Sequence, residues 1–374
     1  MYAVGLAQNT KGPVLRELPK PFIETEDQVL VKVLQVGIDG TDRNMIRYDE
    51  KDLPPGEDFI TLGHEALGRV EAVGSKVKTL RPGDMVTPTV RRGCNECAPC
   101  LNGQSDMCYT GRYKERGIHK LHGFFTEYFV EREEYLVKVP PDLGPLAILA
   151  EPLSISEKAL SQLRSLQLRV PWLCEHAEHN YGSEAWGHCK QALVIGAGPL
   201  GLLGIALLRL AQVDTWVVEV ASPEHKKVQL LKELGAHHVD AREKTPLVIT
   251  EEVGSPDFIL EASGASDVAF NLLPTLARNG VYILTGIPRG ISQVCLDGNL
   301  TLRQLVRYNQ LIVGIINSNR EHYVAALHDL ASLKQTFGPI MDSFISHRFR
   351  LLDYEEAFNF ESKDQVKVIF DLTL

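Results

Sequence analysis

The sequence predicts an α/β protein of two domains, one rich in β-strands and one built on a doubly wound parallel sheet. Three observations support this expectation: a length of 374 residues, a first part made of short strand segments separated by turns, and a second part in which strands and helices alternate. A chain of this length exceeds what one hydrophobic core usually serves. We expect the β-rich domain at residues 1–158 and 320–374, and the parallel sheet at residues 159–319.

The composition excludes several classes of protein. The chain is 44% hydrophobic and 23% charged, with a formal net charge of −9, which is typical of a globular protein. The negative charge and the lack of a long basic cluster argue against nucleic-acid binding. The N-terminus lacks the pattern of a signal peptide, and the longest apolar run, residues 200–208, is too short to span a bilayer. We therefore expect a cytoplasmic protein with no membrane partner and no nucleic-acid partner.

The β-rich domain is predicted from its residue pattern. Residues 28–36 carry the β-branched bias of a strand, and residues 70–74 and 85–88 are further strand candidates. The turn at residues 81–84 contains a proline and a glycine, which favour the backbone angles of tight turns. Short strands separated by such turns predict a partly open barrel.

Four of the seven cysteines lie close together in the sequence. Their spacing, Cys-x2-Cys-x2-Cys-x7-Cys, places four thiols on a short loop and matches the tetrahedral coordination of zinc. In a chain with no export signal, such a cluster indicates a metal site rather than disulfides. Four protein ligands leave no position for a substrate, so we expect a structural zinc in a lobe at about residues 91–110. The predicted ligands are Cys94, Cys97, Cys100 and Cys108.

A second metal site is indicated by His64 and Glu65, which follow Gly63. Neutral imidazole is a good zinc ligand, and a neighbouring carboxylate can bind the metal or hold its water. The motif is weak by itself, because a loop histidine beside a solvated glutamate has the same sequence. Its interpretation therefore depends on the other motifs of the chain.

The second domain contains a glycine motif with a defined physical role. Gly196, Gly198 and Gly201 form Gly-x-Gly-x-x-Gly between an apolar strand and an apolar helix, which is the context that dinucleotide binding requires. The first glycine permits the tight turn, the second lets a pyrophosphate approach the backbone, and the third lets the helix pack on the strand. The helix N-terminus favours the phosphate charge. The predicted cofactor-binding turn consists of Gly196, Gly198, Pro199, Leu200 and Gly201.

Glu219 ends the next predicted strand, 21 residues after Gly198. At this position a carboxylate accepts hydrogen bonds from the adenosine ribose hydroxyls. Further strand candidates at residues 257–264, 280–286 and 311–314 alternate with helical stretches. This alternation predicts a Rossmann-type, doubly wound parallel sheet that binds a dinucleotide.

Several motifs together resemble those of the zinc-dependent medium-chain alcohol and polyol dehydrogenases. They are Gly-Ile-Asp-Gly-Thr-Asp at residues 37–42, Gly-His-Glu-x-x-Gly at residues 63–68, the cysteine lobe and the glycine turn. The resemblance covers nearly the whole chain. It implies a GroES-like catalytic domain beside a Rossmann domain, two zinc ions per chain and a homo-oligomer, either a dimer or a tetramer. The ligands that it implies for a catalytic zinc are Asp39, His64, Glu65 and Glu151.

Asp39 departs from the family pattern, which usually has a cysteine ligand at this position. A carboxylate oxygen binds zinc at about 2.0–2.2 Å, so the change keeps a ligand. Two alternatives stay open: Asp39 could cap a turn without any metal, and Glu151 could be a helix-start acid before Pro152. Residues 169–190 form an insertion of unknown role, and the spacing around Cys174 does not match a metal finger.

The sequence also resembles the glucose dehydrogenase branch of this family, through Asp39, Glu115, Glu151 and Asn317 together. The resemblance implies that zinc lowers the pKa of the C1 hydroxyl of an aldose, that Thr41 passes the proton toward solvent, and that the C1 hydride moves to a nicotinamide, giving the lactone. Two alternatives stay open: Glu115 could pair with a neighbouring arginine instead of binding sugar, and Lys367 could lie on a solvated strand face instead of contacting the cofactor. The implied substrate contacts are Thr41, Glu115, Glu151 and Asn317, and the further implied cofactor contacts are Gly286, Asn317 and Lys367.

The cofactor preference is predicted from the residues at the end of the second Rossmann strand. The glucose branch often carries arginines there, which hold the 2′-phosphate of NADP, whereas residues 219–221 contain none and begin with Glu219. A carboxylate repels that phosphate, so we expect NAD to be preferred. Lys226 and Lys227 lie downstream and leave NADP possible.

Two other functions remain open from the sequence. The same metal could oxidise a simple alcohol or polyol instead of a sugar. The chain could also bind a cofactor without catalysis, in which case Asp39 would mark a lost metal.

Overall fold

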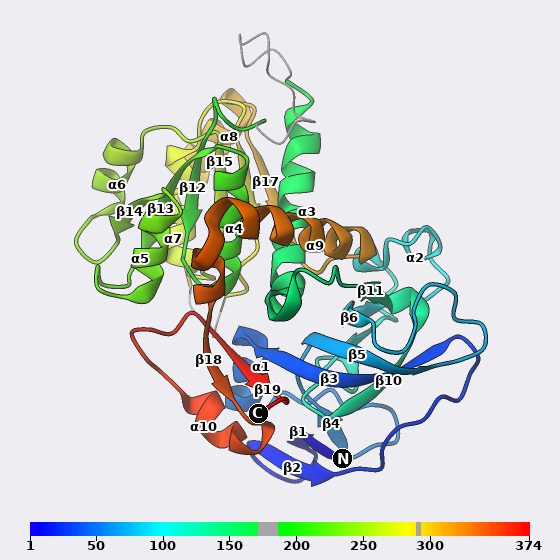
Figure 1. Ribbon diagram of the computed structural model, residues 1–374. Helices are drawn as coiled ribbons and strands as arrows, with labels where there is room; N and C mark the ends of the chain where they lie inside the picture. Colours follow the sequence, from blue (N-terminus) through cyan, green and yellow to red (C-terminus); the bar gives the residue numbers. More distant parts are fainter. Residues whose placement is uncertain (171–185, 289–292) are drawn as a thin grey trace. The chain divides into compact units, whose positions relative to one another are not determined.

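The computed structural model describes residues 1–170, 186–288 and 293–374 (Figure 1). Most of the predicted insertion at 169–190, including Cys174, lies outside the described residues. The chain divides into two compact units. The predicted domains divide after residues 158 and 319, whereas the observed units divide after residues 154 and 316 and place residues 332–341 in the second unit. Unit 1 comprises Met1–Ser154, Asn317–Ala331 and Asp342–Leu374, and unit 2 comprises Ile155–Ile316 and Ser332–Met341.

Unit 1 is built around β3 (Gln28–Ile38), the longest strand of a seven-stranded sheet. One edge of β3 pairs with β5 (Glu65–Val73). The other edge pairs with β10 (Tyr128–Arg132) along its first half and with β19 (Lys367–Asp371) along its second half. The strand predicted at 28–36 is therefore correct but two residues longer. The strand predicted at 70–74 is the end of β5, which begins at Glu65.

The other strands of unit 1 complete this sheet or form two small three-stranded sheets, β2-β1-β4 and β7-β8-β9. The segment predicted as a strand at 85–88 is β6. These strands are β1 (Tyr2–Ala7), β2 (Pro13–Glu17), β4 (Phe59–Thr61), β6 (Met85–Pro88), β7 (Arg91–Arg92), β8 (Lys114–Arg116), β9 (Lys120–Leu121), β11 (Leu136–Lys138) and β18 (Ile345–Phe349).

Aromatic side chains join Phe125 to the C-terminal segment of the chain in the core of unit 1. The rings of Phe125 and Phe370 meet edge to face with centroids 5.0 Å apart, and both side chains are fully buried. Phe358 packs edge-on against Phe370 at 5.6 Å. Such contacts stabilise the core beyond their buried area. The helices of this unit include α1 (Gly40–Tyr48), α2 (Ala98–Leu101) and α10 (Tyr354–Asn359), while α3 (Ala150–Gln167) and α9 (Arg320–Phe337) cross the division between the units.

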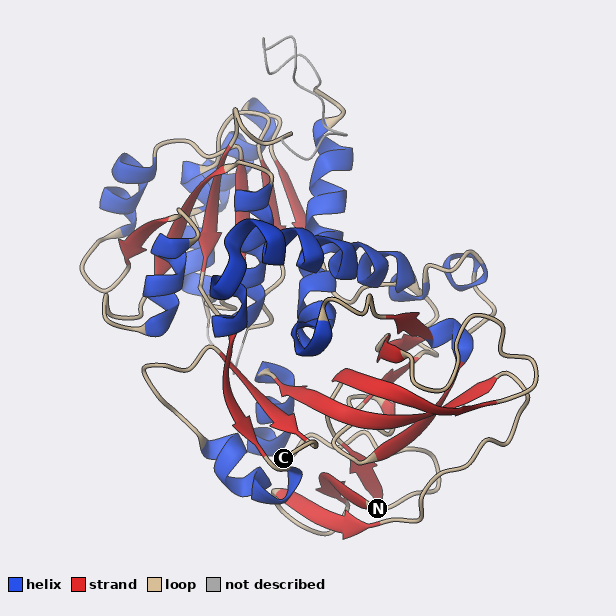
Figure 2. Ribbon diagram, in the orientation of Figure 1, coloured by secondary structure: helices blue, strands red, loops and turns tan. Residues whose placement is uncertain are grey.

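Unit 2 contains a six-stranded parallel sheet in the order β14-β13-β12-β15-β16-β17 (Figure 2). Numbered along the chain, this is the order 3-2-1-4-5-6 of the Rossmann fold, in which the strand order reverses between the first and the fourth strand. The predicted doubly wound sheet is therefore confirmed. Its strands are β12 (Gln191–Ile195), β13 (Asp214–Glu219), β14 (His237–Asp240), β15 (Phe258–Glu261), β16 (Val281–Leu284) and β17 (Leu311–Gly314). Its helices are α4 (Pro199–Leu210), α5 (Lys226–Glu233), α6 (Pro246–Val253), α7 (Ser266–Asn271) and α8 (Gly298–Arg307).

Membrane insertion has no support from the helices. Among the described residues, none of them combines the length and the apolar character that crossing a bilayer requires.

Candidate active site

The four clustered cysteines form one compact site in unit 1. Their sulfur atoms all lie within 4.8 Å of one another, and the Cys94–Cys100 and Cys97–Cys108 sulfur pairs are 3.8 and 3.9 Å apart. A tetrahedron with zinc–sulfur bonds of about 2.3 Å has edges of about 3.8 Å. Hydrogen bonds from the Thr110 hydroxyl and from nearby backbone amides lower the pKa of Cys94 to about 6. The donor set and its spacing fit a structural zinc.

A second ligand group consists of Asp39, His64 and Glu65, whose ligand atoms also lie within 4.8 Å of one another. The sequence places them here for separate reasons. Asp39 caps α1, since its Oδ1 accepts from the backbone N–H groups of Thr41 at 2.7 Å and Asp42 at 3.1 Å. Its other oxygen, Oδ2, lies 3.5 Å from Nε2 of His64. One carboxylate thus caps the helix and still has an oxygen facing His64, so the observed cap does not by itself exclude a metal ligand at Asp39.

Asp42 is a site residue that the sequence analysis missed. It is fully buried, and its Oδ1 accepts from the Gly63 N–H at 3.2 Å and lies 3.8 Å from Nδ1 of His64. Its Oδ2 accepts from the Asp39 N–H at 3.0 Å, which completes a capping box. A carboxylate behind a metal-binding histidine fixes the orientation of the ring. The available signal was an acid three residues after Asp39, which is the spacing of a capping box.

Glu65 and Lys367 form a buried ion pair next to this group. They begin β5 and β19, the two strands that flank the end of β3. Gly37 of β3 leaves the space between them, because a Cβ atom at that position would lie 1.7 Å from Oε2 of Glu65. Lys367 is 1% exposed, so the alternative that it is a solvated strand residue is wrong. Its predicted contact with the cofactor stays a prediction.

The charges around this site favour a bound cation. Burial raises the pKa of Glu151 to about 8, and the neighbouring charges of Glu65 and Asp39 act in the same direction. Burial lowers the pKa of His64, but the Asp39 and Asp42 carboxylates outweigh burial and hold it well above its usual value. Glu151 lies in the first turn of α3, outside the three-residue ligand group. Four carboxyl groups, those of Asp39, Asp42, Glu65 and Glu151, thus gather near one imidazole and one ammonium, and a divalent metal would favour their ionised forms.

The predicted sugar-binding residues Glu115 and Asn317 meet although 202 positions separate them. The Asn317 side-chain amide donates to Oε1 of Glu115 at 2.8 Å. Asn317 has a φ of +55°, in the left-handed region that asparagine tolerates better than most residues. Glu115 also pairs with Arg91, the residue directly opposite in the β7–β8 ladder. The arginine pairing considered as an alternative is therefore present, together with the contact to Asn317.

The glycine turn in unit 2 has the geometry of a dinucleotide site. Gly196 directly follows β12 with a φ of +93°, and a Cβ on Gly201 would lie 2.1 Å from the Gly196 carbonyl oxygen. A Cβ on Gly198 would have no atom within 4 Å, which leaves open the side where a pyrophosphate would approach. Pro199 and Leu200 begin α4, whose N-terminus faces this opening.

Glu219 lies at the end of β13 and reaches back to the glycine turn. Its Oε2 accepts from the Ala197 N–H at 2.6 Å, and its Oε1 accepts from the Val220 and Ala221 N–H groups at 2.8 and 3.0 Å. The carboxylate is therefore held beside the turn that would hold the cofactor phosphates. Gly286 follows β16, where its N–H donates to the Glu261 carbonyl at 3.2 Å.

Comparison with known families decides which family this architecture represents. Residues 144–372 match the family model described as "Glucose dehydrogenase C-terminus", and residues 25–141 match "Alcohol dehydrogenase GroES-like domain". The chain belongs to the glucose dehydrogenase family. The resemblance to zinc-dependent medium-chain dehydrogenases and the predicted fold class are confirmed by these matches.

Relatives of this glucose dehydrogenase family member cover almost its full length. The chain is 34% identical over 348 residues to "Glucose 1-dehydrogenase" of Methanocella arvoryzae, with 92% of each chain covered. It is 35% identical over 358 residues to that of Thermoproteus tenax, covering 96% of this chain and 95% of the relative.

Solved structures show the same fold. The Haloferax mediterranei glucose dehydrogenase in complex with NADP, Zn and gluconolactone superposes with a TM-score of 0.87, at 31% identity and over 100% of both chains. The alcohol dehydrogenase TADH from Thermus sp. superposes with a TM-score of 0.78 at 24% identity, covering 99% of each chain. The second likeness speaks for the fold alone.

Proposed function

We propose that this member of the glucose dehydrogenase family oxidises the C1 hydroxyl of an aldose such as glucose to the lactone and passes the hydride to a nicotinamide cofactor. The observation that carries the proposal is the gathering of Asp39, His64 and Glu65 ligand atoms within 4.8 Å. Relatives that share a third of the sequence are glucose 1-dehydrogenases, and the Haloferax structure holds Zn and gluconolactone.

The protein's own residues prepare the site for a zinc ion. Asp39 Oδ2 and His64 Nε2 would hold the ion. The carboxylates of Glu65 and Glu151 would bind it directly or through a water molecule. Asp42 keeps the His64 ring in place, and the helix cap keeps Asp39 in place. When bound, zinc lowers the pKa of the coordinated hydroxyl and favours loss of its proton.

Thr41 is proposed as the residue that takes this proton. It follows the Asp39 cap by two positions at the start of α1, and its backbone N–H holds Asp39. Its hydroxyl Oγ1 makes no hydrogen bond with any residue that the structure describes, so it is available to accept a proton from the substrate and to release its own proton to solvent. The nicotinamide supplies the hydride acceptor.

The sugar is proposed to be recognised by Glu115, Glu151 and Asn317. A site built from carboxylates and an amide discriminates strongly between sugars, because a missing hydroxyl leaves its polar partner unsatisfied. Glu115 and Asn317 are already joined by a hydrogen bond. Gly286 of unit 2 and Asn317 and Lys367 of unit 1 are proposed to contact the nicotinamide end of the cofactor.

NAD is proposed as the preferred cofactor, with NADP possible. The run at residues 219–221 contains no arginine, and the Glu219 carboxylate is held beside the glycine turn. A ribose 2′-hydroxyl can donate to this carboxylate, whereas a 2′-phosphate would be repelled.

The direct test is to incubate the purified protein with NAD and a panel of aldoses, alcohols and polyols. We expect close to two zinc ions per chain, reduction of NAD with glucose, and gluconolactone or its hydrolysis product by NMR. Turnover of alcohols or polyols but not of aldoses would contradict the proposed substrate. One zinc per chain without any turnover would instead indicate a non-catalytic cofactor-binding protein.

A cytoplasmic homo-oligomer is the proposed state of the protein. The six described cysteines are free thiols, and a thiolate site for zinc persists best in a reducing compartment. β17 is an edge strand that exposes Ile312, and α8 exposes three large aliphatic side chains, features that a partner subunit commonly covers. The exposed α8 residues are Leu300, Leu302 and Val306. Light scattering of the purified protein would show whether it is a dimer or a tetramer.

A further inference from the structure

Arg91 is a buried arginine that neither the predicted motifs nor the proposed reaction uses. It lies on β7 directly opposite Glu115 on β8 and is 6% exposed. We infer that Arg91 is a positioning residue for sugar recognition, which holds Glu115 together with Asn317 in one orientation and anchors both to the cysteine lobe. This inference rests on the proposed function, because it assigns Glu115 a role toward the sugar.

The guanidinium of Arg91 is held on its edges and on its face. Its Nε donates to Oε1 of Glu115 at 3.0 Å, and its Nη2 forms an ion pair with the same oxygen at 2.9 Å. Its Nη1 donates to the backbone carbonyl of Asp106 at 2.9 Å, and its central carbon lies 3.8 Å from the centre of the Tyr113 ring. A planar guanidinium with these partners has one orientation, which a lysine could not reproduce.

The two oxygens of Glu115 have different environments. Oε1 accepts a hydrogen bond from Nε of Arg91 and another from the Asn317 amide at 2.8 Å, and it also pairs with Nη2 of Arg91. Oε2 accepts no hydrogen bond from any residue that the structure describes, although a carboxylate oxygen can accept two. Glu115 is thus fixed through one oxygen and presents the other, which is the arrangement needed to read a sugar hydroxyl.

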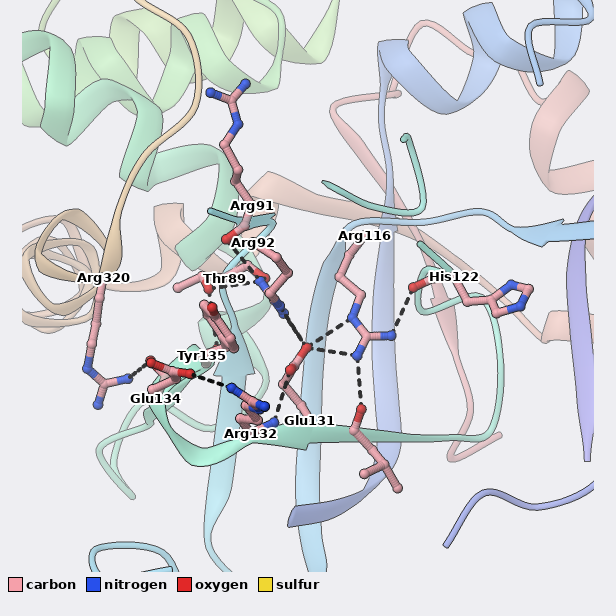
Figure 3. Close-up of polar contacts among 11 residues, drawn as sticks. Thr89, Arg91, Arg92, Arg116, His122, Glu131, Arg132, Glu134, Tyr135 and Arg320 are labelled. Atoms are coloured by element: carbon pink, nitrogen blue, oxygen red, sulfur yellow. Dashed lines mark hydrogen bonds and ion pairs between the residues drawn. The ribbon is translucent and has the colours of Figure 1, made fainter. Parts of the chain in front are cut away.

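The neighbouring buried carboxylate, Glu131, shows the contrasting arrangement (Figure 3). Its Oε2 accepts from both Arg92 and Arg116, and its Oε1 accepts from the Arg132 N–H at 2.9 Å. Both oxygens are used inside the protein, so this pair of arginines serves the fold. Arg92 therefore provides a matched control for Arg91, one position away on the same strand.

The cysteine lobe holds the Glu115–Asn317 pair from two sides. Asp106, whose backbone carbonyl accepts the hydrogen bond from Arg91, lies between Cys100 and Cys108. Gln104 of the same loop accepts from the Asn319 side-chain amide at 2.7 Å, two residues after Asn317. The lobe that carries the structural zinc thereby sets the position of both sugar-reading side chains.

The test is a double-mutant cycle of R91Q and E115Q, read as KM and kcat for glucose and as KM for NAD. If Arg91 acts through Glu115, each single variant raises KM for glucose about tenfold or more, with KM for NAD unchanged and kcat changed far less. The double variant is then no worse than E115Q, because the two changes remove one function. R91K keeps the charge without the fork and should recover part of the affinity.

Two controls separate positioning from folding. R92K should lower the melting temperature and leave KM for glucose within about twofold, and R112Q, at an exposed pair with Glu96, should change neither. Deoxyglucoses add a further readout: the analogue that lacks the hydroxyl read by Glu115 should lose its disadvantage against glucose in R91Q and E115Q alike.

The outcomes distinguish the two proposals. Effects of R91Q and E115Q that multiply, or an R91Q variant with normal KM for glucose, would overturn the role of Arg91 while leaving the proposed function in place. If R91Q does not fold, an R91K variant with fully normal sugar affinity and discrimination would overturn it equally. A wild-type protein that oxidises no aldose would overturn the proposed function and this inference with it.

Discussion

The two units of the protein build their functional sites in different ways. In unit 1 the sites depend on charged side chains taken out of solvent, such as the Lys367–Glu65 pair and the Arg91–Glu115 pair. In unit 2 the site depends mainly on backbone shape, with the open side of Gly198 and the left-handed Gly196 forming the turn. A buried charge tolerates few substitutes, whereas a backbone cradle is insensitive to most side chains around it. Side-chain changes should therefore have larger effects in unit 1 than in unit 2.

The largest effect is expected for His64→Ala. Loss of the imidazole removes a proposed metal ligand, and a catalytic zinc contributes several kcal/mol to charge stabilisation in the transition state. Turnover of glucose should fall by roughly a thousandfold or more, while the circular dichroism spectrum is preserved and bound zinc falls from two ions to one. Retention of most of the activity would show that the catalytic site is elsewhere.

The next largest effect is expected for Cys97→Ser in the cysteine lobe. A closed zinc site contributes directly to folding, and a loss of about 3 kcal/mol would lower the melting temperature by roughly 6–12 °C. Thermal unfolding and zinc analysis measure this. An unchanged melting temperature with one zinc lost would mean that the lobe is dispensable for stability. It would also count against the expectation that side-chain changes have larger effects in unit 1 than in unit 2.

Acid should weaken unit 1 through Glu131. Burial raises the pKa of Glu131, but Arg116 and Arg92 outweigh burial and lower it from 4.5 to about 2. The ionised form is therefore favoured in the folded state, and its stabilisation, about 3 kcal/mol, is present above pH 4.5 and is lost as the pH falls toward 2. Denaturant unfolding across this range should show that the free energies of unfolding of wild type and Glu131→Gln converge as the pH falls. A constant difference between the two proteins would contradict a stabilising role for ionised Glu131.

The smallest effect is expected in unit 2, at Glu219. We expect wild-type kcat/KM to favour NAD over NADP by about tenfold or more, about 1.4 kcal/mol, and Glu219→Ala to narrow that gap. Glu219→Gln is the matched control, because its amide oxygen can still accept from the Ala197 N–H while the charge is gone. If charge sets the preference, both variants narrow the gap; equal wild-type use of both cofactors would refute the prediction.

The sequence predicted best those features that depend on residues close together along the chain. The cysteine lobe and the glycine turn are each contained in a short segment, so their spacing carries their geometry. Asp39 was predicted to be either a metal ligand or a cap without metal, and the structure shows a cap whose second oxygen faces His64. A residue pattern does not distinguish the two oxygens of one carboxylate.

Features that depend on distant segments were predicted poorly. Asn317 and Glu115 were each proposed to contact sugar, but their hydrogen bond joins positions 202 residues apart. Lys367 was assigned to the cofactor, and its pairing with Glu65 follows only from the placement of β5 and β19 on either side of β3. Strand register over such separations is set by the assembled core, which no short motif encodes.

The Lys367–Glu65 pair also has a consequence for how the protein is made. Glu65 emerges from the ribosome early, whereas Lys367 emerges 302 residues later, after the whole of unit 2 has been synthesised. Until β19 pairs with β3, the nascent N-terminal segment has an open sheet edge and a glutamate that cannot be buried at low cost. The buried ion pair of unit 1 can therefore form only after the last strand has been synthesised and has paired with β3.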